Sequence, residues 1–212
     1  MSVLTEGSTV EKWSGVGGYM AGLQDELSTH FAQHALDPTH WIATAHHLMS
    51  AAERLAPDIE QFWNRLDQLD EEGTFSLSDM VGSQYQNIFM MLYGFAIENF
   101  CKAYVVSKLS KDERSRLKSG GLPNKLKTHD LEGLVTKEIG LAVDNGEKEL
   151  LKRLEATVTW AGRYPVSTGP MKKQEFKKQM LAMPQGLRGD DLVRARQLAQ
   201  RIKDHVCVKI GV

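Results

Sequence analysis

The chain has 212 residues, 42% of them hydrophobic and 25% charged, which is the composition of a soluble globular protein with one sizeable core. Two cysteines, Cys101 and Cys207, exclude a disulfide framework, and their apolar surroundings predict buried thiols in a reducing compartment. The first residues lack the basic and apolar regions of a secretory signal, so we expect a cytoplasmic protein without a membrane segment.

The net charge of -1 conceals an uneven distribution along the sequence. Residues 1–75 carry three basic and twelve acidic side chains, whereas the remainder carries 23 basic and 15 acidic ones. The basic excess is concentrated in residues 102–127 and 172–203. This distribution predicts either a basic face suited to phosphate or nucleic acid, or acidic and basic segments that pack together and cancel.

Residues 1–36 are expected to form a glycine-containing arm and a first helix over residues 20–34. The run GVGGYMAG resembles a phosphate-binding glycine loop only superficially, because no strand precedes it and no Lys-Ser/Thr pair follows it. Glu26, His30 and His34 recur at four-residue steps and would share one helix face. They match no recognised metal signature, so we expect neither a metal site nor a cofactor.

A long apolar seam begins after Asp37-Pro38, where an acceptor side chain precedes a proline suited to the first helical position. Its members recur at alternating spacings of four and three: Trp41, Ala45, Leu48, Ala52, Leu55, Ile59, Phe62, Leu66 and Leu69. The seam keeps its register across Pro57, which predicts a kinked helix or two nearly coaxial helices. It ends at a predicted turn over residues 70–73.

The most apolar stretch lies in the next predicted helix, which Ser76 or Ser78 is expected to cap and which runs to about Leu109. Residues 88–97 carry no charge, and a helix that is apolar all round is normally buried by neighbours on more than one face. The lengths of this helix and the preceding seam are similar. We therefore expect an antiparallel helical hairpin.

Shorter helices are predicted beyond this hairpin. Thr128 or Asp130 is expected to cap a helix over residues 131–143, and Gly162 to end a helix over residues 147–161. Further helices are expected over residues 111–117 and 174–182 and from about residue 190 to the C-terminal end.

No segment has the alternation of a strand, so the predicted fold is all-α. We expect a helical bundle over residues 37–170, built on the long antiparallel hairpin. Residues 171–212 are expected to form a basic segment and a helix that pack on this bundle.

Three short motifs occur in order: AIENFCKAYVV at residues 96–106, THDLEGL at 128–134 and GRYP at 162–165. They resemble the A-x-E-x-x-x-K-A, T-H-D-L-x-x-L and R-Y-P patterns of the HEPN superfamily (higher eukaryotes and prokaryotes nucleotide-binding). The resemblance covers residues 41–170 and implies a HEPN-like helical bundle, often a homodimer with a cleft along its twofold axis. Family members include metal-independent ribonucleases of toxin-antitoxin, phage-defence and RNA-processing systems, and non-catalytic proteins that bind RNA or nucleotides.

The nuclease signature of this family, an Arg followed a few residues later by His, is missing here. Arg163 is followed by Tyr-Pro-Val-Ser-Thr-Gly-Pro, and His129 is preceded by Leu-Pro-Asn-Lys-Leu-Lys-Thr. The resemblance therefore implies a protein that binds RNA or a nucleotide through a basic cleft, rather than a conventional HEPN nuclease.

Metal-independent RNA cleavage requires a base for the 2′-hydroxyl, an acid for the leaving oxygen and a cation beside the phosphorane. His129 is the candidate acid or base and Arg163 the candidate phosphate clamp, which makes a metal-independent ribonuclease the alternative function. The residues expected to contact a ligand are Glu98, Lys102, Asp130, Tyr164, Lys125 and Lys127.

The same residues also have a structural interpretation. Glu98 and Lys102 would form an intrahelical pair, and His129 would bond to a neighbouring backbone group at a helix start. Arg163 would pair with Glu98, so that a buried network of Glu98, His129 and Arg163 joins three helices of the bundle. A third hypothesis is a protein-interaction module. The expected partners are thus RNA or a nucleotide, a second copy in a homodimer, or a cognate protein such as an antitoxin.

Overall fold

The computed structural model describes residues 33–72, 81–118, 121–161 and 189–212. Within these ranges the chain is helical and has no strand, which confirms the all-α prediction. The predicted helix over residues 174–182 lies outside the described residues, as do Ser76, Ser78 and almost all of the first predicted helix.

The helix α2, Pro38–Glu53, begins as the sequence predicts. Asp37 caps it by accepting a hydrogen bond from the Thr39 N–H at 2.9 Å. Its apolar seam faces inward, since Ala45 and Ala52 are fully buried. Local capping chemistry and the spacing of apolar residues therefore account for this helix.

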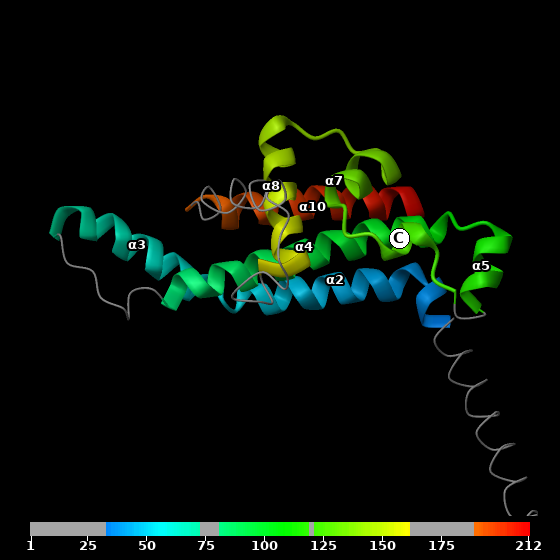
Figure 1. Ribbon diagram of the computed structural model, residues 1–212, viewed down its shortest axis with the longest axis horizontal. Helices are drawn as coiled ribbons and strands as arrows, with labels where there is room; N and C mark the ends of the chain where they lie inside the picture. The colour runs from blue at the N-terminus through cyan, green and yellow to red at the C-terminus, as the bar shows by residue number, and fades with distance from the viewer. Residues whose placement is uncertain (1–32, 73–80, 119–120, 162–188) are drawn as a thin grey trace, which may run out of the picture.

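A turn at Arg54 and Leu55 interrupts the seam and separates α2 from α3, Ala56–Glu72. Two helices rather than one kinked helix thus span this region, and α3 continues from α2 with a bend (Figure 1). Pro57 lies in the first turn of α3, where its missing N–H breaks no helical hydrogen bond. Ile59 is fully buried, so the inward face continues across the interruption.

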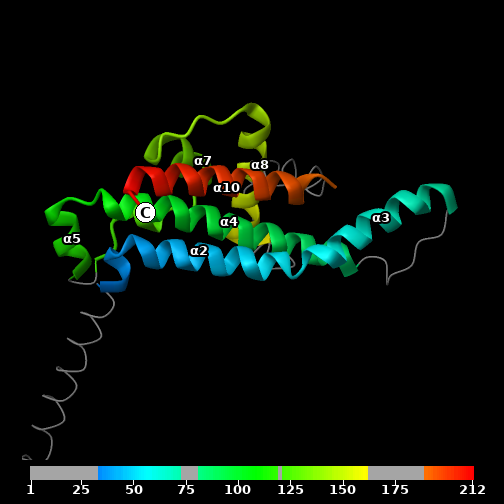
Figure 2. The ribbon, with the colours of Figure 1, turned by 180° about the vertical axis from the view of Figure 1, so that it is seen from behind.

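The helix α4, Val81–Ser107, lies between α2 and α10, Asp191–Ile210, along the length of the bundle (Figure 2). It runs antiparallel to α2 and parallel to α10. Most of its apolar stretch is buried: Phe89, Met90, Tyr93, Ala96 and Ile97 are at most 1% exposed. The prediction that several neighbours bury this stretch is confirmed.

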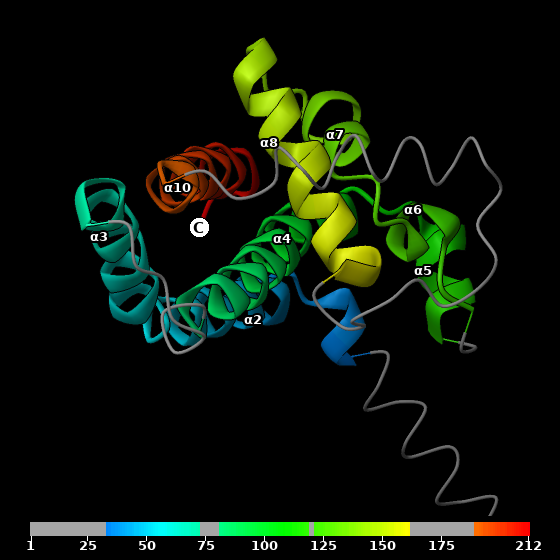
Figure 3. The ribbon, with the colours of Figure 1, turned by 60° about the vertical axis from the view of Figure 1, so that its left-hand side comes forward.

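The helix α8, Asn145–Ala156, crosses α4 steeply and continues as the π-helical turn η3, Thr157–Ala161 (Figure 3). Gly94 makes this close crossing possible. A Cβ atom at Gly94 would lie only 2.5 Å from Cγ2 of Val158 and 3.2 Å from the carbonyl oxygen of Leu154. Any larger residue here would push α8 away from α4.

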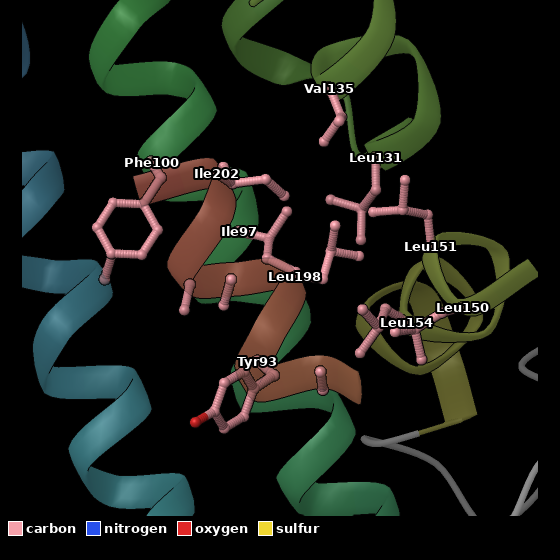
Figure 4. Close-up of a cluster of buried hydrophobic side chains, with 14 of the residues drawn as sticks. Tyr93, Ile97, Phe100, Leu131, Val135, Leu150, Leu151, Leu154, Leu198 and Ile202 are labelled. Atoms are coloured by element: carbon pink, nitrogen blue, oxygen red, sulfur yellow. The ribbon is translucent and has the colours of Figure 1, made fainter. Parts of the chain in front are cut away.

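One core joins α4 to the segments on both sides of it (Figure 4). Figure 4 shows side chains that meet from four parts of the chain: Tyr93, Ile97, Phe100, Leu131, Val135, Leu150, Leu151, Leu154, Leu198 and Ile202. All five apolar positions predicted for the last helix are buried in α10: Leu192, Ala195, Ala199, Ile202 and Val206. The final helix therefore shares the core of the bundle.

The helix predicted over residues 131–143 is shorter in the structure, so the predicted end at residue 143 is wrong. The chain forms α7, Leu131–Gly133, and the π-helical turn η2, Leu134–Glu138, and the helix stops there because Gly140 adopts a left-handed φ of +67°. Asp144 then caps α8 instead of only breaking a helix, in a capping box with Glu147.

Two short helices lie beside the end of α4. The first, α5, Lys111–Lys118, matches its prediction, and its Arg114 donates hydrogen bonds to the carbonyl oxygens of Val106 in the last turn of α4 and of Leu109 just after it. The second, α6, Asn124–Lys127, was not predicted. Together they lead the chain back over α4.

Both cysteines are free thiols. Cys101 is buried as predicted, but Cys207 is only partly buried, because it lies toward the edge of the inward face of α10. None of the helices that the structure describes combines the length and the hydropathy needed to cross a membrane.

Candidate functional site

The predicted intrahelical pair is present near the end of α4. The Lys102 Nζ atom lies 2.6 Å from Oε1 of Glu98, one helical turn away. Both side chains are nearly buried, with exposed fractions of 6% for Lys102 and 7% for Glu98. Burial of two charges is tolerated here because each neutralises the other.

His129 completes the cluster from the loop between α6 and α7. Its Nδ1 atom lies 2.8 Å from the second carboxylate oxygen of Glu98, and its side chain is 44% exposed. His129 therefore contacts Glu98, 31 residues away in the sequence, and not the neighbouring backbone group that the structural interpretation also allowed. We call Glu98, Lys102 and His129 the His129 site.

The loop that carries His129 is held by hydrogen bonds on either side. Thr128 Oγ1 accepts from the Asp130 N–H at 3.0 Å, and Asp130 Oδ1 accepts from the Gly133 N–H at 2.7 Å. Leu131 anchors the loop because its side chain is fully buried and its N–H donates to Glu155. His129 is thus placed by fixed neighbours and not by its own contact alone.

The contact with Glu98 determines which imidazole nitrogen stays available for other partners. A carboxylate only accepts hydrogen bonds, so Nδ1 of His129 carries the proton that it shares with Glu98. The other nitrogen, Nε2, is bonded by no residue within the described ranges. In the neutral ring Nε2 accepts a proton, and in the protonated ring it donates a hydrogen bond to an anion.

Glu155 on α8 is a further acidic group beside the loop, and no motif pointed to it. It accepts a hydrogen bond from the Leu131 N–H at 3.2 Å. Burial raises the pKa of the Glu155 carboxyl, the charges of Asp130 and Glu132 raise it further, and the Leu131 hydrogen bond opposes them. The sequence signal for Glu155 is weak, because it is one acidic residue among several on an amphipathic helix.

The remaining candidate residues are placed around the His129 site or outside the described ranges. Asp130 is the cap of α7, and Lys125 pairs with Glu113 at 2.8 Å. Lys127 is exposed at the end of α6. Arg163 and Tyr164 lie outside the described residues, so the predicted pairing of Arg163 with Glu98 stays a prediction.

A shallow depression of about 110 Å³ adjoins the loop that carries His129. It is lined by Lys125, Thr128, Asp130, Gly133, Leu134, Lys137 and Glu138. Pockets that enclose small ligands typically have volumes of about 300–1,000 Å³. The depression is therefore too small to enclose a ligand of that size.

Among the residues that the structure describes, no group of three His, Cys, Asp or Glu side chains is arranged to hold a metal ion. The chain matches no family model, no curated protein and no solved structure. Function must therefore be inferred from the chemistry of the His129 site.

Proposed function

We propose that the chain is a HEPN-like protein that binds RNA or a nucleotide, with a phosphate group held by His129. The observation that carries this proposal is the half-exposed imidazole of His129, whose Nδ1 is fixed on the buried carboxylate of Glu98. Such an arrangement presents Nε2 to a ligand in a fixed direction, which lowers the ordering cost of binding.

The charges of the His129 site support an anionic ligand. Glu98 and Lys102 cancel each other, so protonation of His129 gives the group a net positive charge. Of the acidic neighbours, Glu132 lies 3.7 Å from Lys152, whereas Asp130 and Glu155 lie beside the same loop and oppose an anion. A phosphate oxygen at Nε2 would meet a charged N–H donor, because Glu98 shares its single negative charge between Lys102 and the protonated imidazole.

Lys102 has a positioning role in this proposal. Its ammonium group is buried and bonded to Glu98, so it acts on a ligand through Glu98 and His129. Lys127 is exposed and supplies long-range attraction for phosphate. Lys125 contributes less, because Glu113 pairs with it.

The proposal is tested by fluorescence anisotropy with a labelled single-stranded RNA, comparing the intact chain with His129→Gln. A charge-assisted hydrogen bond is worth about 1.5–3 kcal/mol, so this variant should bind at least about tenfold more weakly. The matched control is His47→Gln, which removes an exposed imidazole from α2 and should leave affinity unchanged. Equal affinities of His129→Gln and the intact chain would contradict the proposal.

A metal-independent ribonuclease is the second candidate, because the contact with Glu98 also orients His129 as a general base. Incubation of the pure protein with RNA in EDTA tests it. Cleavage that disappears in His129→Gln would support an enzyme. Binding without cleavage would support the binding protein.

The proposal of a HEPN-like protein also includes a biological process and an oligomeric state. We propose a homodimer that acts in defence or in a toxin-antitoxin pair, in accord with the resemblance of the three sequence motifs. Light scattering on the intact chain gives its mass directly. A monomer at micromolar concentration would remove the homodimer from the proposal and leave RNA binding at the His129 site to be tested separately.

A further inference from the structure

A second surface lies where α4 and α10 end side by side (Figure 1). The ring of Tyr104 on α4 is partly buried, and two ammonium groups lie over it, each 5.4 Å from the ring centroid. One belongs to Lys108 on the next turn of the chain and the other to Lys209 on α10. We call these three residues the Tyr104 surface.

The two lysines of the Tyr104 surface are held differently. Lys209 is fixed by a hydrogen bond of 2.6 Å from Nζ to the carbonyl oxygen of Ile139, which His205 Nε2 also approaches at 2.9 Å. Lys108 is exposed, and within the described ranges its ammonium group contacts only the Tyr104 ring. Lys108 can therefore move to a phosphate while Lys209 stays beside the ring.

We propose that the Tyr104 surface binds one nucleotide of a single-stranded RNA, with a base against the Tyr104 ring and a phosphate at Lys108. This inference rests on the proposed function and selects an RNA strand over a free nucleotide as the ligand. An aromatic ring flanked by cations is the arrangement with which proteins bind single strands, because every base has a face for stacking and every linkage carries a charge.

The distribution of the binding groups supports an extended ligand. The depression beside the His129 loop, at about 110 Å³, is too small to enclose a nucleotide. From Glu98 to Tyr104 the rise along α4 is about 9 Å, and the two side chains point to different sides of the helix. One nucleotide has too few phosphates to occupy both places, whereas a strand of several nucleotides can reach from His129 to Tyr104.

The first measurement compares ligands of different length by competition against a labelled oligouridylate of about twelve nucleotides. The proposal expects unlabelled oligouridylate of this length to compete far better than uridine monophosphate at equal nucleotide concentration. Equal competition by the oligouridylate and uridine monophosphate would contradict RNA-strand binding at the Tyr104 surface. It would leave nucleotide binding at the His129 site intact. No binding of either ligand would overturn the proposed function itself.

The second measurement uses variants of the Tyr104 surface in the same assay. Tyr104→Leu should weaken binding by about 5- to 100-fold, whereas Tyr104→Phe, which keeps the ring, should bind like the intact chain. Lys108→Ala should weaken binding. It should also reduce the slope of the logarithm of the binding constant against the logarithm of the salt concentration by about 1, as expected for the loss of one phosphate contact. The matched control is Arg54→Ala, which removes the same charge from the far end of α2 and should change neither quantity.

Each outcome decides the proposal. Unchanged binding by Tyr104→Leu and Lys108→Ala, with loss of binding by His129→Gln, would overturn the Tyr104 surface but support the His129 site. Circular dichroism shows whether Tyr104→Leu is folded, and the exposed Lys108→Ala keeps the proposal testable if it is not. Equal losses in Lys108→Ala and Arg54→Ala would indicate general electrostatic attraction and would also overturn it.

Discussion

The Nδ1 atom of His129 lies 2.8 Å from Oε2 of Glu98, while Oε1 of the same carboxylate lies 2.6 Å from Nζ of Lys102. One buried carboxylate thus neutralises a cation on its own helix and orients an imidazole from a distant loop. The structural and the functional interpretations of these residues are therefore compatible. Glu98 is expected to contribute to stability through Lys102 and to ligand binding through His129.

Replacement of Glu98 tests the stability contribution. Glu98→Gln leaves the Lys102 ammonium buried without its counter-charge and should lower the free energy of unfolding by about 3 kcal/mol. In the double variant Glu98→Gln/Lys102→Met no charge is left unpaired, so most of this loss should be recovered. Urea denaturation of both variants and of Lys102→Met gives the coupling energy between the side chains at positions 98 and 102. Strictly additive losses would show that the two side chains do not depend on each other.

Replacement of Gly94 tests the close crossing of α4 and α8. A methyl group there would lie 3.2 Å from the Leu154 carbonyl oxygen and even closer to Val158. Gly94→Ala should therefore destabilise the protein by about 1–3 kcal/mol, although alanine favours helix. The matched control is Gly146→Ala in α8, where the nearest atom is the flexible end of Arg194. The unfolding temperature of Gly146→Ala should be well above that of Gly94→Ala. The reverse order would exclude tight packing at the crossing.

Glu155 provides a prediction about pH. Its folded pKa is raised mainly by burial, so the folded state holds its proton more tightly than the unfolded state does. Stability is therefore greatest below the unfolded value, near 4.5, and falls as the pH rises through the folded pKa. Glu155→Gln, which keeps an acceptor for the Leu131 N–H, should be more stable than the intact chain at pH 7. This advantage should vanish near pH 4.

The same variant should also strengthen RNA binding at pH 7, because it removes a negative charge close to His129. Asp58→Asn, an exposed charge on α3, is the control and should leave affinity unchanged. Weaker binding by Glu155→Gln would indicate that no anion binds near His129.

Arg196 provides the opposite pH dependence. The pKa of Glu53 is lowered first by its hydrogen bonds with Arg196 and then by the hydroxyl of Tyr93, which donates to Glu53 at 2.5 Å. This stability is present above the unfolded pKa, near 4.5, and is lost as the pH falls through the folded pKa. Arg196→Met should thus cost up to about 1 kcal/mol at pH 7, since both partners are partly exposed.

The loss in Arg196→Met should shrink as the pH falls below 4.5 and through the lowered folded pKa of Glu53. Arg194→Met is the matched control on the same helix, because its nearest carboxylate, on Asp190, is 3.7 Å away and exposed. Urea denaturation at pH 7 and at acidic pH measures the stability loss of each variant. A loss in Arg196→Met that does not depend on pH would show that packing of the arginine stem, rather than its charge, holds α10 against α2.

The sequence predicted the buried faces of the helices well, because burial repeats with the period of the helix itself. Ala45, Ala52 and Ile59 on one seam and Leu192 to Val206 on another are buried as their spacing requires. The ends of the helices were harder to predict. The helix that begins at Leu131 ends before Gly140, because the left-handed backbone of that glycine stops it, and a single glycine in a sequence does not show its φ.

For the His129 site, the sequence predicted the residues better than their contacts. The spacing of Glu98 and Lys102 was sufficient to predict their pairing, since both lie on one helix. The contact of His129 with Glu98 depends on how the loop after α6 folds back over α4, which no local pattern encodes. The approach of Glu155 to the same loop depends on the packing of α8 and was missed for the same reason.

The central claim is that Nε2 of His129 binds a phosphate while Glu98 holds Nδ1. Long-range ¹H–¹⁵N NMR of the imidazole, recorded during titration with single-stranded RNA, tests it most directly. The free protein should show the neutral ring with its proton on Nδ1 at alkaline pH, and RNA should shift the Nε2 resonance and stabilise the protonated ring. A neutral ring in the free protein with its proton on Nε2 instead of Nδ1, or an unchanged Nε2 resonance when RNA is saturating, would contradict the claim.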